Sequence, residues 1–362
     1  MNTEFYPLEI SELERLTREA VAIRFTVPEH LKTRFQFHQG QHIIIKTQID
    51  GQEIRRSYSI CGNVQHQELQ IAIKRIPDGI FSNYANDHLQ PGMSLEIMPP
   101  QGHFYTELDE DQEKHYLCIA AGSGITPILS HIRSILSIES RSRVSLIYAN
   151  KSTTLMMFRN KLSFTKNQYM DRFQWVNLFT SEQQDAEIFN GRISADKLTQ
   201  LNEKHVIQLK EIDEAFLCGP EEMIKEIMPF LESQGLTDNH IHYELFFADS
   251  AEKNMLKKQQ QRSEQFDKEV SRVTVKLSGR KTSFDLPLGG ANILDAALEE
   301  GADLPFSCKV GVCAACKSKL VKGSVDMDEN HALTEDEVAD GMILTCQSHP
   351  TSKAVEIDFD VN

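Results

Sequence analysis

The strongest constraint on the fold of this 362-residue chain is a group of four cysteines near its C-terminal end. Three of them follow the spacing Cys308-x4-Cys313-x2-Cys316, and Cys346 follows the last of these after twenty-nine intervening residues. A short loop that carries three thiols, completed by a fourth from elsewhere, is typical of a site that holds metal. The last part of the chain must therefore fold so that one loop and one distant residue meet.

The spacing distinguishes between two kinds of metal site. Plant-type [2Fe–2S] ferredoxins use C-x4-C-x2-C with a distant fourth cysteine, and two thiolates bind each iron. The alternative is zinc, but zinc knuckles prefer two C-x2-C pairs and this chain has one such pair. Cys61 and Cys118 lie in or beside β-rich runs and are interpreted as buried apolar side chains. The residues predicted to hold the cluster are Cys308, Cys313, Cys316 and Cys346.

The charge composition makes one class of partner improbable. Lys and Arg total 38 and Asp and Glu total 53, which gives a formal net charge of −15. Because phosphate binding needs basic patches, we expect no nucleic-acid partner. No apolar run approaches the roughly 20 residues needed to span a bilayer, so no membrane association is expected. The opening Met-Asn-Thr-Glu-Phe-Tyr lacks the basic start and apolar core of a signal peptide, and we expect a cytoplasmic protein.

Residues 1–110 have the pattern of an antiparallel β domain. Short β-rich runs are separated by turn residues such as Asp50-Gly51 and Pro77-Asp78-Gly79. Several short strands at this spacing predict a barrel or a sandwich. The strands are expected over Val21–Val27, Gln41–Thr47, Arg56–Ile60, Leu69–Ile76 and Met93–Met98.

Residues 111–247 change to an alternation of strands and helices, which predicts a parallel sheet with helices on its faces. Buried strands are expected over Tyr116–Ala121, Val144–Ala149, Phe173–Thr180 and Ala215–Cys218. Helices are expected over Ile125–Ile138, Thr154–Phe164 and Glu221–Ser233.

The last third begins with a polar stretch over residues 248–270, rich in Gln and Lys, which is interpreted as a linker. Residues 271–362 then form a small α+β domain that holds the four clustered cysteines. Seven carboxylates lie between Asp326 and Asp340. They indicate either a solvated helix face or a surface that steers this domain towards a basic partner.

Two glycine-rich turns indicate nucleotide binding in the α/β region. Gly122-Ser123-Gly124 directly follows an apolar strand and opens a helix, where glycines let the backbone approach a pyrophosphate and the helix N-terminus favours its charge. A lone Gly-x-Gly is more often only a tight turn. Here, however, Cys218-Gly219-Pro220 ends a later strand of the same sheet. Both turns would lie at the carboxyl edge of the sheet, where nucleotides bind.

The β domain carries a pattern suited to a flavin. In Arg56-Ser57-Tyr58-Ser59 an arginine can pair with a phosphate, a tyrosine can stack on an isoalloxazine ring and serine hydroxyls can hold N5 and phosphate oxygens. Gly79-Ile80-Phe81-Ser82 follows downstream. By itself, the first segment would be better explained as an exposed strand with alternating polar side chains.

Together these motifs resemble the ferredoxin–NADP reductase-type flavin reductases that carry a C-terminal plant-type ferredoxin domain, over essentially the whole chain. The stretches Met98–Phe104, Met156–Arg159 and Leu294–Ala297 further resemble the reductase subunits of ring-1,2-phenylacetyl-CoA epoxidases. The usual Gly-Gly-Val-Cys turn of these proteins is Val310-Gly311-Val312-Cys313 here. The resemblance implies an antiparallel β-barrel for the flavin, an α/β parallel-sheet nucleotide domain and an α+β β-grasp ferredoxin domain.

The resemblance also implies roles for individual residues. The R-x-Y-S and G-x-x-S flavin elements fall on Arg56, Ser57, Tyr58, Ser59, Gly79 and Ser82, and an aromatic residue near the flavin falls on Phe246. The nicotinamide site falls on Gly122, Gly124, Thr126, Pro127, Cys218, Gly219 and Pro220. Tyr58, Ser59 and Cys218 are the residues expected at the reacting centre, and packing is an equal alternative for Phe246.

The cofactors are expected to be FAD, a [2Fe–2S] cluster and NADPH. The resemblance favours FAD over FMN. An acidic residue that would hold a free ribose 2′-OH is missing after Val144–Ala149, whereas Lys151, Ser152 and Arg159 could accept a 2′-phosphate. NADH is the alternative electron donor.

The resemblance implies electron transfer from NAD(P)H through FAD and the cluster to an oxygenase component, most closely the diiron epoxidase of phenylacetate degradation. One alternative keeps this path and changes the acceptor to another oxygenase, a hydroxylase or a desaturase. A different class of protein would use the flavin and cluster to signal redox state to a partner. No DNA-binding or kinase-like module is visible in the sequence.

Overall fold

The chain folds into two compact units, described here one at a time from a computed structural model that covers residues 4–246, 269–288 and 290–361. The larger unit holds residues 5–54 and 58–246. The smaller unit holds the described residues from Glu269 onward, together with Glu4 and residues 55–57. Residues 248–268 of the predicted linker lie outside the described residues, and Val270 already begins a strand.

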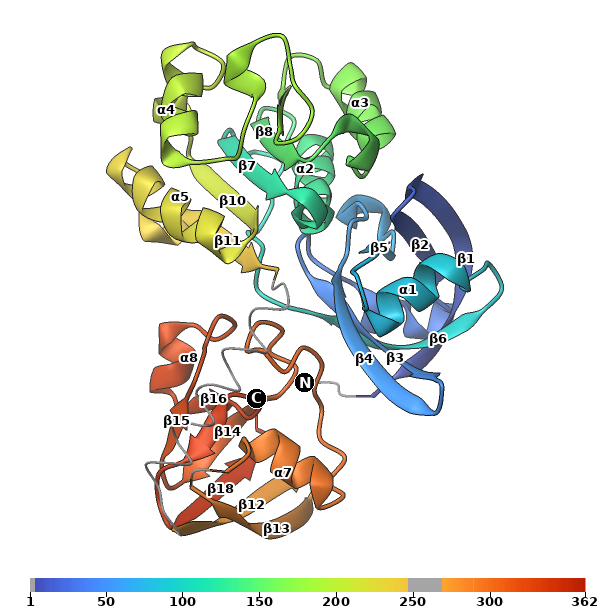
Figure 1. Cartoon of the computed structure of the whole chain (residues 1–362), viewed down its shortest axis with the longest axis vertical. Coiled ribbons are helices and arrows are strands. Elements are labelled where there is room, and N and C mark those ends of the chain that lie inside the picture. The colour runs from blue at the N-terminus through green and yellow to red at the C-terminus, as the bar shows by residue number, and fades with distance from the viewer. Residues whose placement is uncertain (1–3, 247–268, 289, 362) are drawn as a thin grey trace. The chain divides into compact units, whose positions relative to one another are not determined.

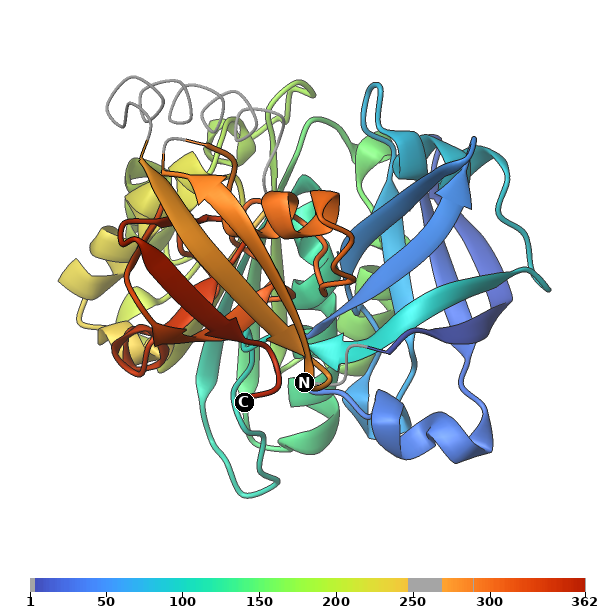
Figure 2. The ribbon, with the colours of Figure 1, turned by 90° about the horizontal axis from the view of Figure 1, so that it is seen from below.

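The larger unit begins with a six-stranded antiparallel sheet that curves into a half-barrel. Neighbouring strands follow the order β4-β3-β6-β1-β2-β5, and a bridge between Ile60, just beyond β4, and Ile71 of β5 brings the two edges together. The curved blue and cyan strands can be followed in Figure 2. The barrel elements are β1 (Tyr6–Thr17), β2 (Ala20–Thr26), β3 (His42–Ile49), β4 (Gln52–Ser59), β5 (Gln70–Lys74), α1 (Ile80–Asp87) and β6 (Ser94–Gln101).

Five of these six strands overlap the predicted ones, and the long strand β1 was not predicted. Its sequence YPLEISELERLT carries four glutamates or arginines at exposed or half-exposed positions. Only Leu8, Ile10 and Thr17 are buried in it, so the alternation of apolar and polar residues is weak. Its pairing with β2 and β6 stabilises it as a strand, which local sequence preference does not reveal.

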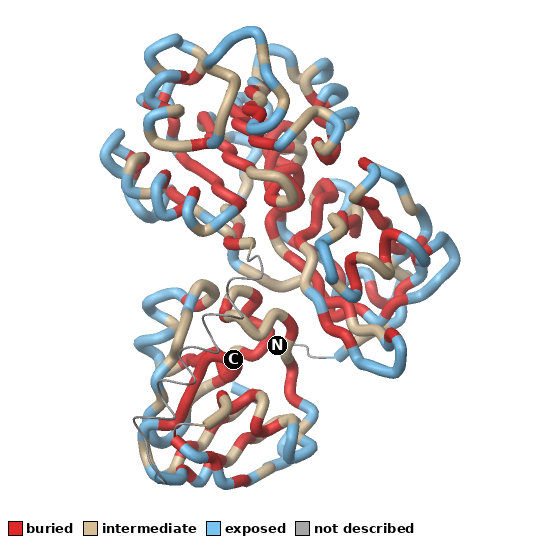
Figure 3. The backbone as a smooth tube through the Cα atoms, viewed as in Figure 1, coloured by how far each residue is buried: buried red, intermediate tan, exposed pale blue. Residues whose placement is uncertain are grey.

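The second part of the larger unit is a five-stranded parallel sheet in the order β11-β10-β7-β8-β9. The order reverses between β7 and β10, which creates the crevice where nucleotides bind in open α/β sheets. Figure 3 shows the central strands as buried, in agreement with their apolar sequences. The strands are β7 (His115–Ala121), β8 (Arg143–Asn150), β9 (Phe173–Phe179), β10 (Glu214–Gly219) and β11 (Ile241–Leu245).

Helices pack on this sheet, with α4 and α5 on one side and α2 and α3 on the other in Figure 1. Their bounds are α2 (Ile125–Ile138), α3 (Arg159–Gln168), α4 (Ala195–Glu203) and α5 (Glu221–Ser233). The prediction of a helix over Thr154–Phe164 was wrong in its start. Phe158 has a left-handed φ of 57°, so α3 cannot extend back through it, and residues 153–155 form a separate short turn. No helix in the described ranges combines the length and the apolar character needed to cross a bilayer.

Helix α2 joins the barrel to the sheet, because its side chains contact both of them. Ile128, Leu129 and Ile132 are fully buried in the core around the sheet. The Ser130 hydroxyl donates to the Gly62 carbonyl of the barrel region at 2.7 Å, and this bond is buried. Further polar contacts along the same seam join Arg133 to Glu68, Ser134 to Val64, Ser137 to Asn63 and Lys161 to Gln70.

The smaller unit is a mixed sheet with the strand order β13-β12-β18-β14-β16 and a small β15–β17 pair beside it. Apolar side chains from the strands and from α7 form its core, among them Val273, Phe284, Ile293, Leu344 and Ile357. The elements are β12 (Val270–Leu277), β13 (Arg280–Pro287), α7 (Ile293–Glu299), β14 (Lys317–Lys322), β15 (Val325–Met327), α8 (Glu335–Ala339), β16 (Met342–Leu344), β17 (Ser348–Pro350) and β18 (Ala354–Asp358).

The acidic stretch of this unit is not uniformly solvated. Asp328 is buried against His349, with 3.1 Å between carboxylate and ring, and Glu337 caps α8 and pairs with Lys317 at 2.9 Å. Glu335, Asp336 and Asp340 are exposed. Five of the seven carboxylates therefore divide between internal structural contacts and exposed positions at helix α8.

We expect Gly40→Ala to destabilise the larger unit far more than Gly51→Ala. Both glycines have positive φ angles, +84° and +80°, which cost a Cβ-bearing residue about 1–2 kcal/mol. A Cβ on Gly40 would also overlap the Phe104 carbonyl and the His131 ring, whereas a Cβ on Gly51 meets nothing within 4 Å. Such overpacking adds about 1–3 kcal/mol. Urea unfolding of the two full-length variants measures the difference, and equal midpoints would contradict the packing at Gly40.

Candidate flavin, nucleotide and iron–sulfur sites

The predicted nucleotide loop forms the turn between β7 and α2. Gly122 has a φ of +55°, and its carbonyl accepts a hydrogen bond from the Tyr148 hydroxyl at 3.1 Å. The Thr126 hydroxyl donates to the Ser123 carbonyl at 3.0 Å, so this predicted residue fixes the turn from inside. A Cβ on Gly124 would overlap the Cys218 carbonyl. Glycine at this position therefore lets the two predicted turns touch.

Lys74, which was not predicted, lies beside this loop. The ammonium nitrogen of Lys74, at the end of β5, is 3.9 Å from the position that a Cβ on Gly122 would take. A cation next to a glycine turn and a helix N-terminus suits a pyrophosphate. A lysine at the end of a barrel strand gives no sign of this in the sequence, because only the fold brings it to the loop.

The second predicted turn follows β10. Pairing in register places Cys218 beside Ala120 of β7 on one side and beside Glu244 of β11 on the other. Cys218 is completely buried, and burial followed by the nearby Glu244 carboxylate raises the pKa of its thiol well above the ordinary value. The Phe246 N–H donates to the Gly219 carbonyl at 3.3 Å. Phe246 therefore lies at the predicted nicotinamide turn, whereas Pro220 is exposed.

Ser59 connects the barrel to these turns. It is the last residue of β4 and is buried, and its hydroxyl donates to Oε2 of Glu244 at 3.0 Å. Burial raises the pKa of Glu244 to about 7, an effect that the hydrogen bond from Ser59 partly offsets. The fold thus brings together two residues predicted at the reacting centre, Ser59 and Cys218, around a carboxyl group that can hold a proton near neutral pH.

Glu244 was given no role from the sequence, although it lies two residues before the predicted Phe246. The usable signal was a carboxylate on a strand that ends at the carboxyl edge of a predicted nucleotide-binding sheet. Charged groups with shifted pKa values in such crevices are candidates for function.

The remaining flavin residues occupy β4 and the start of α1. Arg56 is exposed on β4, and Tyr58 is partly buried with its ring centroid 5.7 Å from that of Phe81. The Ser82 hydroxyl accepts the Ile76 N–H at 3.1 Å. In this structure Ser82 therefore fixes the turn before α1, whose N-terminal end follows Gly79.

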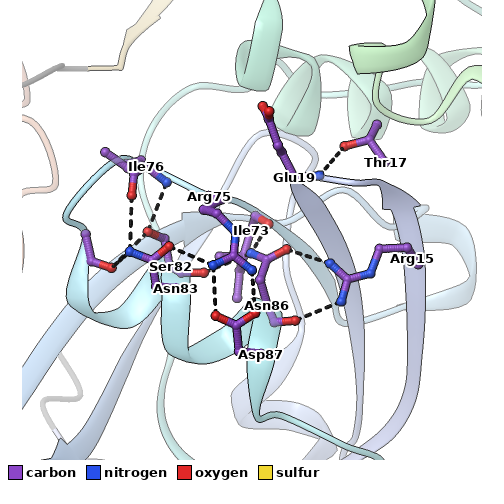
Figure 4. A network of polar contacts seen from close by, with 11 residues as sticks. Arg15, Thr17, Glu19, Ile73, Arg75, Ile76, Ser82, Asn83, Asn86 and Asp87 are labelled. Carbon is purple, nitrogen blue, oxygen red and sulfur yellow. Dashed lines mark hydrogen bonds and ion pairs between the residues drawn. The ribbon is translucent and has the colours of Figure 1, made fainter.

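Figure 4 shows how α1 is held in place. Arg15 of β1 donates to the Asn86 side chain and carbonyl at 3.0 and 2.7 Å. Arg75 donates to Asn83 at 2.9 Å and pairs with Asp87. These contacts fix the orientation of a helix whose N-terminal end is the predicted phosphate site.

The predicted 2′-phosphate residues lie on the surface. Lys151 follows β8 and Arg159 begins α3, and both are exposed. Glu182, which the sequence did not single out, accepts hydrogen bonds from the Thr153 N–H at 2.7 Å and its hydroxyl at 2.6 Å. These bonds and the nearby Arg159 charge lower the pKa of Glu182. The loop after β9 thus supplies an acidic group to the segment that carries the two predicted cations.

The four clustered cysteines lie close enough together to affect one another's pKa values. Contact with Cys308 and burial raise the pKa of Cys313, and contact with Cys316 and burial raise the pKa of Cys346. Among the residues that the structure describes, no three His, Cys, Asp or Glu side chains are grouped as ligands of a single metal ion. A [2Fe–2S] cluster takes four thiolates, two on each iron, so a group of four neighbouring cysteines fits such a cluster.

The backbone of the three-cysteine loop also fits. The Val310 N–H points at Cys308 Sγ and the Cys308 N–H at Cys313 Sγ, both at 3.4 Å. Contact with Cys313 and then the backbone N–H groups of Val310, Val312 and Cys313 lower the pKa of Cys308 to about 6. Val310, which replaces a usual glycine, does not need a positive φ, because Lys309 and Gly311 carry the left-handed angles of 56° and 81°.

Comparisons with known proteins agree with this division of the chain. Residues 7–105 match the family model of the oxidoreductase FAD-binding domain and residues 118–228 that of the oxidoreductase NAD-binding domain. Residues 275–351 match that of the 2Fe-2S iron-sulfur cluster binding domain. These matches show an FAD site, a pyridine-nucleotide site and a [2Fe–2S] site in one chain.

Two relatives and one solved structure align with nearly the whole chain. One subunit of the 1,2-phenylacetyl-CoA epoxidase of Escherichia coli K12 is 41% identical over 99% of this chain and 98% of its own length. The ferredoxin reductase component of 3-ketosteroid-9-alpha-monooxygenase from Mycobacterium tuberculosis is 31% identical over 98% and 95%. Phthalate dioxygenase reductase, a modular structure for electron transfer from pyridine nucleotides to [2Fe–2S], covers 98% of both chains with a TM-score of 0.60 at 22% identity.

The likeness to phthalate dioxygenase reductase shows the fold, and the identities to the two relatives show the family. The predicted fold class, with an antiparallel barrel, a parallel-sheet domain and a small iron–sulfur domain, is confirmed. The predicted cofactors, FAD, a [2Fe–2S] cluster and a pyridine nucleotide, are confirmed at this level. This chain belongs to the family of NAD(P)H-dependent flavin and iron–sulfur oxidoreductases that contains the reductase components of oxygenases, including that of 1,2-phenylacetyl-CoA epoxidase.

Proposed function

We propose that this protein passes electrons from NADPH to the oxygenase component of a phenylacetyl-CoA epoxidase, in the cytoplasm. Its acceptor would be the diiron subunit of that enzyme. The chain is 41% identical to the Escherichia coli epoxidase protein over 99% of its length, and 31% identical to the steroid monooxygenase component. The higher identity supports an epoxidase as the acceptor rather than a steroid monooxygenase. We assign residues 1–110 to flavin binding, 111–247 to nucleotide binding, 248–270 to a linker and 271–362 to the ferredoxin-type domain.

The observation that carries the proposal is the meeting of Ser59, Cys218 and Glu244. Ser59 comes from the proposed flavin strand, Cys218 from the proposed nicotinamide turn and Glu244 from the neighbouring strand β11. When bound, FAD supplies the step from a two-electron hydride donor to single electrons, and the [2Fe–2S] cluster carries them singly. A site for such transfer must hold a flavin and a nicotinamide against each other, and these three residues lie where the two proposed sites adjoin.

The chain's own residues would hold the groups and exclude water. Ser59 keeps its hydroxyl fixed on Glu244, and Glu244 can keep a proton on its carboxyl group near pH 7. Cys218 presents a buried, protonated thiol to the same place. The flavin would be held by Arg56, Ser57, Tyr58, Ser59, Gly79, Ser82 and Phe246, and the nucleotide by Gly122, Gly124, Thr126, Pro127, Cys218, Gly219 and Pro220.

NADPH is the proposed donor because two exposed cations, Lys151 and Arg159, follow β8, where the adenosine ribose binds in this class of sheet. The Glu182 carboxylate is occupied by the N–H and hydroxyl of Thr153. It is therefore bound to the loop that follows β8, and its oxygens are already engaged as hydrogen-bond acceptors.

The proposal is tested by reconstituting turnover. The wild-type protein should support NADPH-dependent consumption of phenylacetyl-CoA by the purified oxygenase component, and it should reduce cytochrome c. Cys313→Ser should abolish both activities and leave ferricyanide reduction intact, because the nucleotide sheet and all of the barrel except residues 55–57 lie in the other unit.

Ser318→Ala is the matched control, because it removes from the same unit a buried hydroxyl that has no partner among the described residues. It should leave all three activities unchanged. Wild-type turnover with a steroid monooxygenase component but none with the epoxidase would contradict the proposed acceptor. Loss of ferricyanide reduction in Cys313→Ser would contradict independent sites.

Replacing Lys151 or Arg159 with alanine should raise the Michaelis constant for NADPH about tenfold and leave that for NADH nearly unchanged. The factor follows from losing one hydrogen bond to a charged group, about 1.5 kcal/mol. Lys204→Ala, which removes an exposed cation next to α4, serves as the control. Equal effects on both nucleotides would remove these residues from the 2′-phosphate site.

Glu244→Gln should change how stability depends on pH. The pKa of Glu244 is about 7 in the folded protein against an ordinary 4.5, so the folded state binds more protons between these values. Wild-type stability is therefore lost as pH rises from about 4.5 to about 7. The glutamine variant lacks this loss. The difference in urea midpoint, variant minus wild type, should therefore be larger at pH 8 than at pH 5.

The exposed carboxyl of Glu203 provides the control for this experiment, and Glu203→Gln should keep the wild-type pH dependence. If Glu244→Gln and Glu203→Gln behave alike, Glu244 is already ionised in the folded protein at pH 5. Its assignment as a proton holder would then fail.

A further inference from the structure

Gln347, which directly follows the last clustered cysteine, is completely buried and held at both backbone ends. Its N–H donates to the Leu344 carbonyl, and its own carbonyl accepts the Asp328 N–H, both at 2.9 Å. The residue therefore has a fixed position beside Cys346, and the direction of its side chain is set by the fold.

The side-chain amide of Gln347 connects the two segments that carry the cysteines. Its Nε2 donates to the Lys309 carbonyl at 2.9 Å, inside the three-cysteine loop, and to the Cys346 carbonyl at 3.1 Å. The same nitrogen lies 3.7 Å from Cys346 Sγ, within reach of an N–H···S hydrogen bond. One amide thus ties the fourth cysteine to the loop of the other three.

This link falls on a part of the loop that is hard to form. Lys309 adopts a left-handed φ of 56°, which a side chain with a Cβ disfavours. Gly311 follows with a φ of +81°, and a Cβ there would come within 3.2 Å of the Gln347 side chain. Gln347 therefore both holds the strained carbonyl and fills the space behind the loop. The Lys309 ammonium is held separately by Asp295 at 2.6 Å.

The other end of the amide explains why a donor matters at this position. Oε1 of Gln347 is buried and has no hydrogen-bond partner among the described residues. A buried polar atom without a partner is unfavourable, so an apolar side chain of the same size would be better for packing alone. What an apolar side chain cannot supply is the N–H that reaches Lys309 and Cys346.

We propose that Gln347 is a positioning residue of the iron–sulfur site, which clamps Cys346 to the three-cysteine loop and raises the reduction potential of the cluster. The inference rests on the proposed assignment of the four cysteines as cluster ligands. A hydrogen bond to a ligand sulfur stabilises the extra negative charge of the reduced state, so the amide favours reduction. The clamp on Lys309 also keeps the loop closed on its metal.

The experiment compares the purified holoprotein with its Gln347→Met variant, which keeps the length of the side chain and loses the N–H. A potentiometric titration followed by EPR should give a more negative cluster potential for the variant. Loss of iron to a chelator should be about tenfold faster, the usual cost of removing a group that supports a metal ligand. Flavin content and ferricyanide reduction should remain at wild-type levels.

Ser348→Ala is the matched control, because Ser348 is equally buried and its hydroxyl donates at 2.8 Å to the Leu344 carbonyl, away from the cysteine loop. It should keep the wild-type cluster potential. Gln347→Glu keeps the shape and loses the donor when ionised, and should shift the potential in the same direction if the methionine variant fails to fold.

A folded, cluster-loaded Gln347→Met protein with the wild-type potential would overturn the inference, as would an equal shift in Ser348→Ala. Failure of the ligand assignment looks different. In that case wild type would give no reduced [2Fe–2S] EPR signal, or Cys346→Ser would retain it.

Discussion

The contact between the Gly124 backbone and the Cys218 carbonyl is the constraint on which the nucleotide half of the protein depends. Any side chain at residue 124 would push β10 and the start of α2 apart. Because glycine stands there, the two turns at the point where the strand order reverses lie directly against each other. The strand register places Glu244 beside Cys218. Ser59, at the end of β4, donates a hydrogen bond to the carboxyl group of Glu244. Segments far apart in the sequence therefore become neighbours at this end of the sheet.

The joint between barrel and sheet has a different physical character. The apolar residues of α2 are buried in a core shared by the sheet and the barrel residues Ala20, Ala22 and Ala72, while its serines and Arg133 contact the barrel through hydrogen bonds and an ion pair. Each such bond contributes only about 0.5–1.5 kcal/mol but requires a defined geometry. The joint therefore combines apolar burial, which stabilises it, with polar contacts that fix its orientation. That suits a protein in which a strand end of one domain must meet a turn of the other.

The sequence was sufficient to predict the structure wherever a short pattern of residues determines the local conformation. The bounds of α2 and α5 were predicted residue by residue, because apolar periodicity and the flanking turns agree. The glycine loop and the cysteine spacing likewise carry their chemistry in short motifs. Strand β1 was missed because its charged residues mask the strand pattern, and α3 began late because of the left-handed Phe158. The residues that were missed, Glu244, Lys74, Glu182 and Gln347, all acquire their places from contacts with distant segments. Motifs therefore indicate the residues expected to contact the cofactors. Residues that act through contacts between distant segments of the chain are found only in the structure.

Three cysteines lie outside the group of four clustered cysteines, and their burial affects how readily oxidants react with the protein. Burial raises the pKa of Cys61 to about 12 and raises those of Cys118 and Cys218 as well, so all three remain thiols rather than reactive thiolates. Peroxide formed by stray transfer of electrons to oxygen attacks thiolates first. The nucleotide and flavin domains therefore offer it almost no thiolate, and oxidation of cysteine is confined to the small C-terminal unit.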